Sequence, residues 1–428
     1  MACLLSTHAS ESAKMPVMLT ILIILFVAIS GCEILLEQLN LRHQQRHGRT
    51  IPPEFAGTLD QDHLGRAVDY ALAKGRVALS EELFGKAVLA LFIFAGLLPR
   101  YDRLIVGVSG SFVVDGVLFV TGLVLATTLL GIPFSLWKTF GVEARFGFNT
   151  TTLRLWCSDF VKSLLLGLVL LALLSGGALA LIRWSPLYWW LWVWGLFAVT
   201  MLLLMYLSPW LIEPLFFKFK PVTRGDLEVA INALMTRAGL QVERVSQVDA
   251  SRRSRHSNAY FTGIGKVKRI VLFDTLLEQL DDAEILAVLA HEVGHWKKKH
   301  IFKRLLWTEL LALIVCYAGY RLLDWGRLPE LLGLDGGSFY LQVVILLFVA
   351  GLLAFPFTPV SSWRSRRDEK QADDFACALL GDGEALASGL IKLSAENLAN
   401  LHPHPCYAWF YSSHPPIVAR VRRLRRSR

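Results

Sequence analysis

The hydrophobic pattern of this chain is a series of long apolar runs separated by polar segments. A helix needs about 20 predominantly apolar residues to cross the hydrocarbon core of a bilayer. The runs come close to that length, although Lys86 interrupts the second of them. We therefore predict a multi-span α-helical membrane protein with seven transmembrane helices, at about Val17–Leu36, Leu83–Leu98, Phe112–Ile132, Val161–Ile182, Trp189–Leu207, Leu305–Leu323 and Phe339–Pro359.

The polar segment 218–302 predicts an extramembrane α/β unit inserted between the fifth and sixth spans. It contains an amphipathic helix from Asp226 to Ala238, capped by Asp226 and ended by Gly239, and then a candidate strand at Val242–Val248. Asn258–Thr262 and Val267–Phe273 flank residues 263–266 and predict a β-hairpin. We expect four regions: a membrane region of about five helices at 1–217, a catalytic α/β domain at 218–302, two further spans at 303–361 and a C-terminal region at 362–428.

Composition and charge agree with a membrane protein. The 428 residues are 54% hydrophobic, with a mean hydropathy of +0.47, which is too apolar for a soluble protein of this size. The net charge of +9 suits cytoplasmic loops that face anionic lipid, so we expect membrane lipid and no nucleic acid as a partner. The six cysteines are scattered without a C-x-x-C pair, which predicts neither a disulfide framework nor a cysteine metal site.

The distribution of basic residues orients the spans. The polar loop 37–82 carries six lysines and arginines, whereas the loop 99–111 carries two. Because basic loops stay on the cytoplasmic side, seven spans with an external amino terminus place the α/β unit and the carboxyl tail together on that side. We expect a multi-pass protein of a bacterial inner membrane or an endoplasmic reticulum membrane.

Two details of the membrane region leave alternatives open. Ile29-Ser30-Gly31-Cys32 is similar to a bacterial lipoprotein cleavage site, but the first run is longer than a signal-peptide core, which favours a retained span. Asp115 lies within the third run, where it either lines a polar cavity or forms a local hydrogen-bonded pair.

The main chemical motif is His291-Glu292-Val293-Gly294-His295, an H-E-x-x-H pattern on a predicted helix. Asp281, with Glu284 three residues later, gives that helix a capping-box start. The two histidines share one face, so their ring nitrogens can bind one tetrahedral zinc ion, and Glu292 can act as the general base. A chance match on an amphipathic helix is the alternative, and a metal site requires a third protein ligand elsewhere in the chain.

The third ligand is expected in the polar segment after the seventh span. A metzincin would place glycine and histidine where Lys298 and Ile301 stand, so that class is excluded. Glu369 can bind zinc, and Asp373, four residues later on the same helix face, can accept the free N–H of a zinc histidine. We expect a polar helix to begin near Asp368; an ordinary charged helix start is the alternative.

Other segments offer groups for substrate binding and catalysis. His256, Asn258, Ala259 and Tyr260 lie in or before a strand that could hold an extended peptide at a sheet edge, although an ordinary hairpin strand explains them equally well. His402, His404 and His414 concentrate in the tail, and one of them could donate a hydrogen bond to a developing oxyanion. The arginine-rich end, Arg420–Arg428, is interpreted as a lipid-facing basic segment.

Taken together, these segments resemble the type I CAAX prenyl endopeptidases, which are integral-membrane zinc metalloproteases of the gluzincin type. The likeness runs from about the first span to Val421 and rests on these segments: Phe134-Ser135, Phe146-Gly147-Phe148-Asn149-Thr150-Thr151, Pro214-Leu215-Phe216, Lys218-Phe219, Arg255-His256-Ser257-Asn258-Ala259-Tyr260-Phe261, Lys268-Arg269-Ile270-Val271-Leu272, the H-E-x-x-H motif, Ser365-Arg366-Arg367, Glu369, Gln371-Ala372-Asp373 and Ser413-His414-Pro415. One departure is Lys370, where an aromatic residue is usual.

The resemblance implies seven helices around a large intramembrane chamber, with the metal site at its inner rim. It implies one Zn²⁺ per chain held by His291, His295 and Glu369, with Glu292 as base and His414 as a transition-state stabiliser. Asn258 and its strand would hold the substrate. Members of the family remove the last three residues of prenylated C-a-a-X proteins, and some cleave other hydrophobic peptides.

Three other functional classes compete with this interpretation. A heat-shock-type quality-control protease shares the motif and a downstream glutamate but has fewer spans. An intramembrane site-2 protease has its H-E-x-x-H within a span, whereas Trp296-Lys297-Lys298-Lys299 follows the motif here and indicates a surface position. A receptor or transporter with a vestigial site would have lost a ligand or the base, and all four residues are present.

Overall fold

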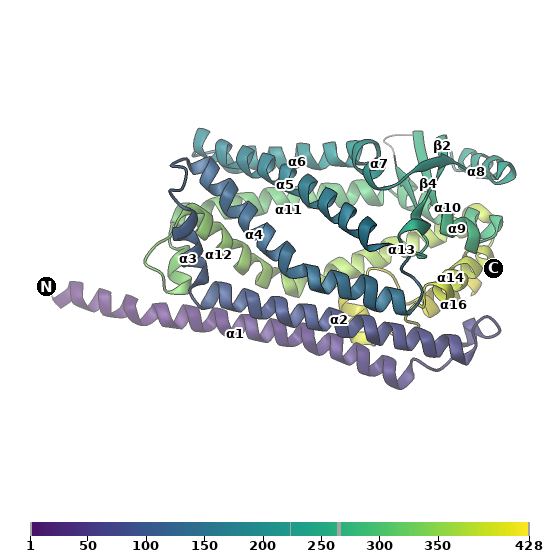
Figure 1. Ribbon diagram of the computed structural model, residues 1–428, viewed down its shortest axis with the longest axis horizontal. Coiled ribbons are helices and arrows are strands. Elements are labelled where there is room, and N and C mark those ends of the chain that lie inside the picture. The colour runs from purple at the N-terminus through teal and green to yellow at the C-terminus, as the bar shows by residue number, and fades with distance from the viewer. Residues whose placement is uncertain (1, 223, 263–266, 427–428) are drawn as a thin grey trace.

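The computed structural model describes residues 2–222, 224–262 and 267–426. Long helices run side by side through most of its length, and a small sheet with short helices lies at one end (Figure 1). The long helices and their connecting turns are α1 (Ala2–His47), α2 (Gln61–Phe94), α3 (Leu97–Ile105), α4 (Phe112–Leu136), α5 (Leu153–Trp184), α6 (Trp189–Leu207), α7 (Glu213–Phe216), α11 (His300–Trp325), α12 (Phe339–Ala354) and α13 (Thr358–Leu380).

Among the described residues, five helical segments are long and apolar enough to cross a membrane, and a bent pair makes a sixth. They contain α1, α4, α5, α6 and α12, and the bent pair is α2 with α3. Each corresponds to a predicted run. The remaining predicted span, Leu305–Leu323, is helical as part of α11 but is not among these segments, so the seven-span arrangement stays a prediction.

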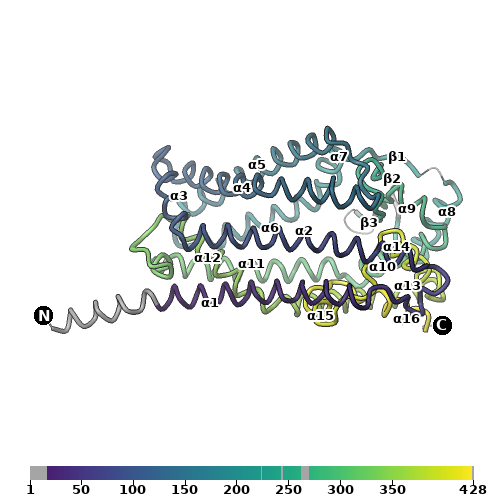
Figure 2. Tube along the Cα trace, turned by 60° about the horizontal axis from the view of Figure 1, so that its bottom comes forward, coloured from purple at the N-terminus to yellow at the C-terminus, as the bar shows by residue number. Residues whose placement is uncertain are grey.

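The weakest run, Leu83–Leu98, is the second half of a much longer helix. α2 begins at Gln61, where the Asp60 side chain accepts a hydrogen bond from the His63 N–H at 2.7 Å. The helix ends before Gly96, whose positive φ of 76° lets the chain turn by 69° into α3. The prediction of a loop over residues 37–82 was therefore wrong, since α1 and α2 extend well beyond their apolar parts. Figure 2 shows these two helices running along the length of the molecule in opposite chain directions.

Asp115 forms the local hydrogen-bonded arrangement and is buried in the first turn of α4. Its carboxylate accepts hydrogen bonds from the Gly107 N–H at 2.8 Å and from the Ser109 N–H and hydroxyl at 2.9 and 2.7 Å. The carboxylate thus closes the turn between α3 and α4, and a polar cavity is not needed to explain it.

The α/β unit follows the predicted elements closely. Within the described residues its sheet has the order β1-β2-β4-β3, in which β2 and β4 are parallel and the other pairs antiparallel. The β3–β4 hairpin is confirmed, and its predicted turn, residues 263–266, lies outside the described residues. The elements of this end are β1 (Phe219–Pro221), α8 (Gly225–Arg237), β2 (Gln241–Val248), β3 (Ala259–Thr262), β4 (Val267–Phe273), α9 (Asp274–Gln279), α10 (Asp282–Lys297), α14 (Glu384–Glu396), α15 (Pro405–Tyr411) and α16 (Ile417–Arg426).

Two local expectations for this unit were wrong. α8 begins at Gly225 without a side-chain cap, and Asp226 lies inside its first turn, where a negative charge still favours the helix dipole. No polar helix begins near Asp368, because α13 starts at Thr358 and carries Glu369 and Asp373 in its middle. α13 also crosses the predicted boundary between residues 361 and 362.

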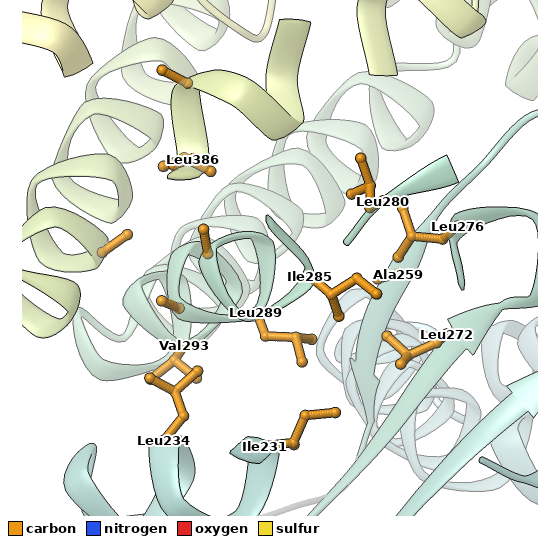
Figure 3. Packing of buried hydrophobic residues seen from close by; sticks show 14 of the residues in the cluster. Ile231, Leu234, Ala259, Leu272, Leu276, Leu280, Ile285, Leu289, Val293 and Leu386 are labelled. Atoms are coloured by element: carbon orange, nitrogen blue, oxygen red, sulfur yellow. The ribbon is translucent and has the colours of Figure 1, made fainter. Parts of the chain in front are cut away.

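One hydrophobic core joins the α/β unit to the C-terminal helices. Leu289 and Val293 of α10 are fully buried and lie near Ile231 and Leu234 of α8 (Figure 3). Leu386, which belongs to α14, is part of the same core. The core also contains Leu272, Ala376, Val421 and Leu424. The segment after residue 362 is therefore a structural part of the unit that positions the H-E-x-x-H helix.

Candidate metal centre

The helix that carries the H-E-x-x-H motif has a well-anchored start. The Asp281 side chain accepts from the Glu284 N–H at 2.9 Å, and the Glu284 carboxylate accepts from the Asp281 N–H at 3.1 Å, which is the predicted capping box. Glu284 is buried and also accepts from the Ser388 hydroxyl and the Lys392 ammonium of α14, at 2.7 and 2.8 Å. The cap thus fixes α10 against the C-terminal region.

Among the described residues, one group of three potential metal ligands converges: His291, His295 and Glu369, with ligand atoms within 4.8 Å of one another. The two Nε2 atoms are 3.1 Å apart. The Glu369 carboxylate lies 3.4 Å from Nε2 of His291 and 3.2 Å from Nε2 of His295. His291 and Glu369 are buried, and His295 is partly buried.

These separations fit a zinc ion. Two ligands at about 2.0–2.1 Å from a tetrahedral ion are roughly 3.3 Å apart, close to all three observed separations. Two imidazoles and one carboxylate are also a ligand set found in catalytic zinc sites, which keep a fourth position open for water or substrate. The residues present therefore match the cofactor that the motif implies.

Gly294, inside the motif, allows α10 and α13 to approach each other closely. A Cβ added at Gly294 would lie 2.8 Å from both Cα and the carbonyl oxygen of Ala372. Both contacts are with backbone atoms, so the neighbour cannot move aside by rotating a side chain. Gly294, the second variable position of H-E-x-x-H, thus helps to bring Glu369 close to the two histidines.

We expect Gly294→Ala to separate the two helices and to weaken metal binding. Overpacking of this kind costs about 1–3 kcal/mol of stability. The measurement is zinc content after dialysis against a graded chelator, together with thermal unfolding in detergent. Gly65→Ala in α2 is the matched control, because a Cβ there meets nothing within 4 Å. Equal zinc retention in the two variants would contradict the packing argument.

Asp373 and Arg420 surround the metal group. Asp373 is fully buried, and its Oδ1 lies 2.9 Å from Nδ1 of His291. Arg420 of α16 donates to both carboxylate oxygens of Asp373, at 2.6–3.1 Å, and its Nη1 lies 3.5 Å from Glu369. Burial lowers the pKa of His291, but the carboxylates of Asp373 and Glu369 outweigh burial, and the net shift is upward. Arg420 offsets the charge of Asp373, so Glu369 is the anionic member of the ligand group beside the two histidines.

The interpretation of Arg420–Arg428 as a lipid-facing segment was wrong for the residues that the structure describes. Arg420 is buried, and Arg423 pairs with Asp373 and Asp374 at 2.7 and 2.6 Å. Arg422 and Arg425 pair with Glu54 and Glu384. The run of arginines suggests a lipid-facing segment, but the spacing of Val421 and Leu424, three residues apart, indicates a helix with a buried face.

Two further predicted residues lie close to the metal group. Glu292 is adjacent to His291 on α10 and makes no hydrogen bond or ion pair with any residue that the structure describes, so its carboxylate is free for a ligand. His414 follows α15, and its Nδ1 lies 2.8 Å from Oε2 of Glu369. Its side chain is 63% exposed, which leaves the ring accessible to a substrate.

The predicted substrate strand is an edge strand. The Phe273 N–H donates to the Asn258 carbonyl, and antiparallel pairing alternates, so the backbone groups of Ala259 and Phe261 face away from β4. The Asn258 side chain accepts from the Ala259 N–H at 2.8 Å. The Ala259 side chain belongs to the core beside α10, which places the free edge next to the motif helix.

His256 and Tyr260 point elsewhere. Tyr260 donates its hydroxyl proton to Glu213 at 2.7 Å, on the other face of the sheet from Ala259. His256 lies before the strand; its ring is stacked on Phe148 and contacts Asn397 and Glu143 at 2.6 and 3.2 Å. The Glu143 carboxylate raises the pKa of His256. The sequence offered no signal for these contacts, because the partners lie 47 to 141 positions away in the chain.

Two protein-family models match this chain. A family model described as the CAAX prenyl protease N-terminal region with five membrane helices matches residues 40–218, and the model of peptidase family M48 matches residues 221–428. A CAAX prenyl protease 1 homolog of Arabidopsis thaliana is 31% identical over 388 residues, covering 88% of this chain and 90% of the relative. The chain belongs to peptidase family M48.

Other M48 relatives cover similar lengths. CAAX prenyl protease 1 of Saccharomyces cerevisiae is 31% identical, over 90% of this chain and 91% of its own, and the human homolog is 30% identical over 88% of each chain. The crystal structure of S. mikatae Ste24p superimposes with a TM-score of 0.86 at 28% identity, over 94% of this chain and 98% of that one. The protein is thus a multi-pass membrane metalloendopeptidase of the M48 family.

Proposed function

We propose that this M48 peptidase is a zinc-dependent endopeptidase that hydrolyses peptide bonds near the C-terminus of prenylated C-a-a-X proteins, or of other hydrophobic peptides. The convergence of His291, His295 and Glu369 beside Glu292, at one end of a bundle of membrane helices, carries this proposal. The substrate class follows from relatives that are named CAAX prenyl protease 1 and align with about nine-tenths of the chain.

His291, His295 and Glu369 hold one zinc ion, and Asp373 and Arg420 support the ligands from behind. When bound, the ion polarises the scissile carbonyl and makes an attacking water more acidic. Glu292, whose carboxylate has no protein partner among the described residues, takes a proton from that water and passes it to the leaving amine. Asp373 accepts the N–H of His291 and so fixes its tautomer.

His414 and the β3 edge bind the substrate around the reacting bond. His414 stabilises the developing oxyanion from the side of Glu369, since its ring is close to that carboxylate and still exposed. The outward backbone edge of β3, at the Ala259 carbonyl and at Phe261, adds the peptide as a further strand, with Asn258 beside it. His256 and Tyr260 act indirectly, because their rings hold the edge to the membrane helices through Glu143 and Glu213.

The proposal includes seven spans around a chamber, with the catalytic end in the cytoplasm. α11 is the seventh span: it packs beside α6, where the Trp194 indole N–H donates to the Glu309 carbonyl at 3.1 Å. Leu311, Ile314 and Val315 are exposed on its surface, as a lipid-facing helix requires. Cavities at the catalytic end, lined by His256 and the membrane helices, support the chamber. Basic residues concentrate at that end, which favours the cytoplasmic side of an endoplasmic reticulum or bacterial inner membrane.

The test is cleavage of one C-a-a-X peptide, in farnesylated and unmodified forms, by the purified protein in detergent. We expect zinc-dependent cleavage of the farnesylated form and at least tenfold slower cleavage of the unmodified form, because the prenyl chain contributes apolar burial. A zinc chelator is the control. Equal cleavage of both forms would favour the alternative, a general quality-control protease without prenyl dependence. Cleavage that persists without zinc would contradict the proposed chemistry.

A further inference from the structure

A cavity of about 650 Å³ lies between α1, α2 and the C-terminal segment, beside the metal group. His414 forms part of its wall, and the same histidine contacts the ligand Glu369. Lys74 and Tyr70 of α2 form another part of the wall, and His256 belongs to the same lining. The cavity therefore extends from the reacting centre to a cationic residue of α2.

Lys74, in the wall of this cavity, has no direct ionic partner among the described residues. Its ammonium group forms no ion pair and no hydrogen bond with any residue that the structure describes. Its ammonium group lies 5.5 Å from the ring centre of Tyr70, one helical turn away, and its charge acts on the Glu143 carboxylate without a direct contact. The Lys74 side chain is exposed on the cavity wall, so its ammonium group is accessible to an anionic group that enters the cavity.

The nearby carboxylates are already engaged. Glu143 accepts the Tyr70 hydroxyl at 2.8 Å and contacts His256, and Glu37 of the same cavity accepts a hydrogen bond from Tyr407. The other cations close to the site are engaged as well. Arg420 pairs with Asp373, and Arg366 donates to the carbonyls of Ala408 and Ser412. Lys74 is thus the cation of this wall that a substrate can reach.

The cavity also offers hydrogen-bond partners for a peptide. Gln44 is 2% exposed, and its Oε1 has no hydrogen-bond partner among the described residues. A buried acceptor without a donor is costly, which indicates an N–H group supplied from outside. Asn40 and Asn400 belong to the same lining, and their amide NH2 groups donate to no residue that the structure describes, since only their Oδ1 atoms are engaged, by the His404 and His402 N–H groups. Amide groups of this kind suit the backbone of a short peptide better than a lipid chain.

We propose that this cavity binds the three residues that follow the scissile bond, with Lys74 pairing with the free C-terminal carboxylate of the substrate. A sphere of 650 Å³ is about 11 Å across, and three extended residues span about 10 Å. The lysine would then select substrates whose chain ends three residues after the scissile bond. This inference rests on the proposed function, and it assigns the specificity for a chain end to one residue.

The experiment compares one farnesylated C-a-a-X peptide with its C-terminal amide, which lacks the negative charge. For the full-length wild-type protein in detergent, we expect kcat/KM to be about ten- to a hundredfold higher for the acid, as for a charge-assisted hydrogen bond. Lys74→Met should bring the acid-to-amide ratio close to one. Lys74→Arg should retain the preference.

Arg76→Met is the matched control. It removes the same charge from α2, two residues away, from an exposed side chain outside the cavity lining, and it should keep the wild-type ratio. An unchanged ratio in Lys74→Met, or no preference in the wild type, would overturn the assignment. Cleavage of the amide by the wild type shows independently that the peptidase is active, so a failed proposed function and a failed subsite give different results.

Discussion

Replacing Glu292 by Gln is expected to lower kcat for peptide hydrolysis by about 10²–10⁴-fold, the contribution typical of a positioned general base. Gln keeps the size of the side chain but cannot accept a proton. Glu292 is not one of the three converging ligands and has no partner among the described residues, so neither the metal group nor the fold should depend on it. The loss should therefore appear in kcat, with zinc content and the unfolding temperature unchanged.

Steady-state cleavage of a farnesylated peptide, with zinc quantified on the same sample, checks this expectation. Asp282→Asn is the control: it removes a carboxylate from the same helix, at an exposed position where the ion pair with Arg224 at 3.2 Å contributes little. It should keep full activity. A Glu292→Gln protein that bound zinc and retained wild-type kcat would show that another group acts as base.

Replacing Arg420 by Met is expected to destabilise the protein by about 3–5 kcal/mol, the usual cost of removing one partner of a buried ion pair. Arg420 is 7% exposed and donates to both oxygens of Asp373, which is fully buried. Without the guanidinium, Asp373 and Glu369 remain as neighbouring buried carboxylates in α13. Arg423, at 2.7 Å from Asp373, compensates only in part because it is half-exposed at the rim.

Chemical unfolding in detergent, followed by zinc titration of the folded variant, measures both consequences. Arg426→Met removes an exposed arginine from the last turn of the same helix and should be neutral. The double variant Asp373→Leu/Arg420→Met should be less destabilised than the sum of the single variants, because their partners are removed together. Additive losses, or an Arg420→Met protein as stable as Arg426→Met, would contradict the buried-pair account.

The parts that could be predicted from the sequence are those with local signals. Asp281 and Glu284 specify the start of α10 within four residues of chain, and the helical spacing of Leu289 and Val293 specifies its buried face. The predicted strands Val242–Val248 and Val267–Phe273, observed as Gln241–Val248 and Val267–Phe273, follow from β-branched residues in short segments flanked by turn residues. Most spans were found because a bilayer imposes a length on every crossing helix.

The parts that could not be predicted depend on contacts between distant segments. Arg420 carries the same charge as its neighbours, and only the fold distinguishes it from Arg426. The contact of His256 with Asn397 joins residues 141 positions apart. α13 continues through the predicted boundary because a polar helix can extend out of a membrane without a break, and hydropathy registers only its apolar part. α11 shows the same limit, since charges such as Glu309 and Arg321 lie within an otherwise apolar helix.

X-ray absorption spectroscopy at the zinc edge tests the central claim most directly, because it reports the ligands of the ion itself. We expect one zinc per chain, with two nitrogen ligands at about 2.0–2.1 Å, further oxygen ligands at about 2.0–2.2 Å and no sulfur. In Glu369→Gln, zinc content should fall sharply while the fold persists. Full zinc retention in that variant, or sulfur in the first coordination sphere of the wild type, would contradict the assignment of His291, His295 and Glu369.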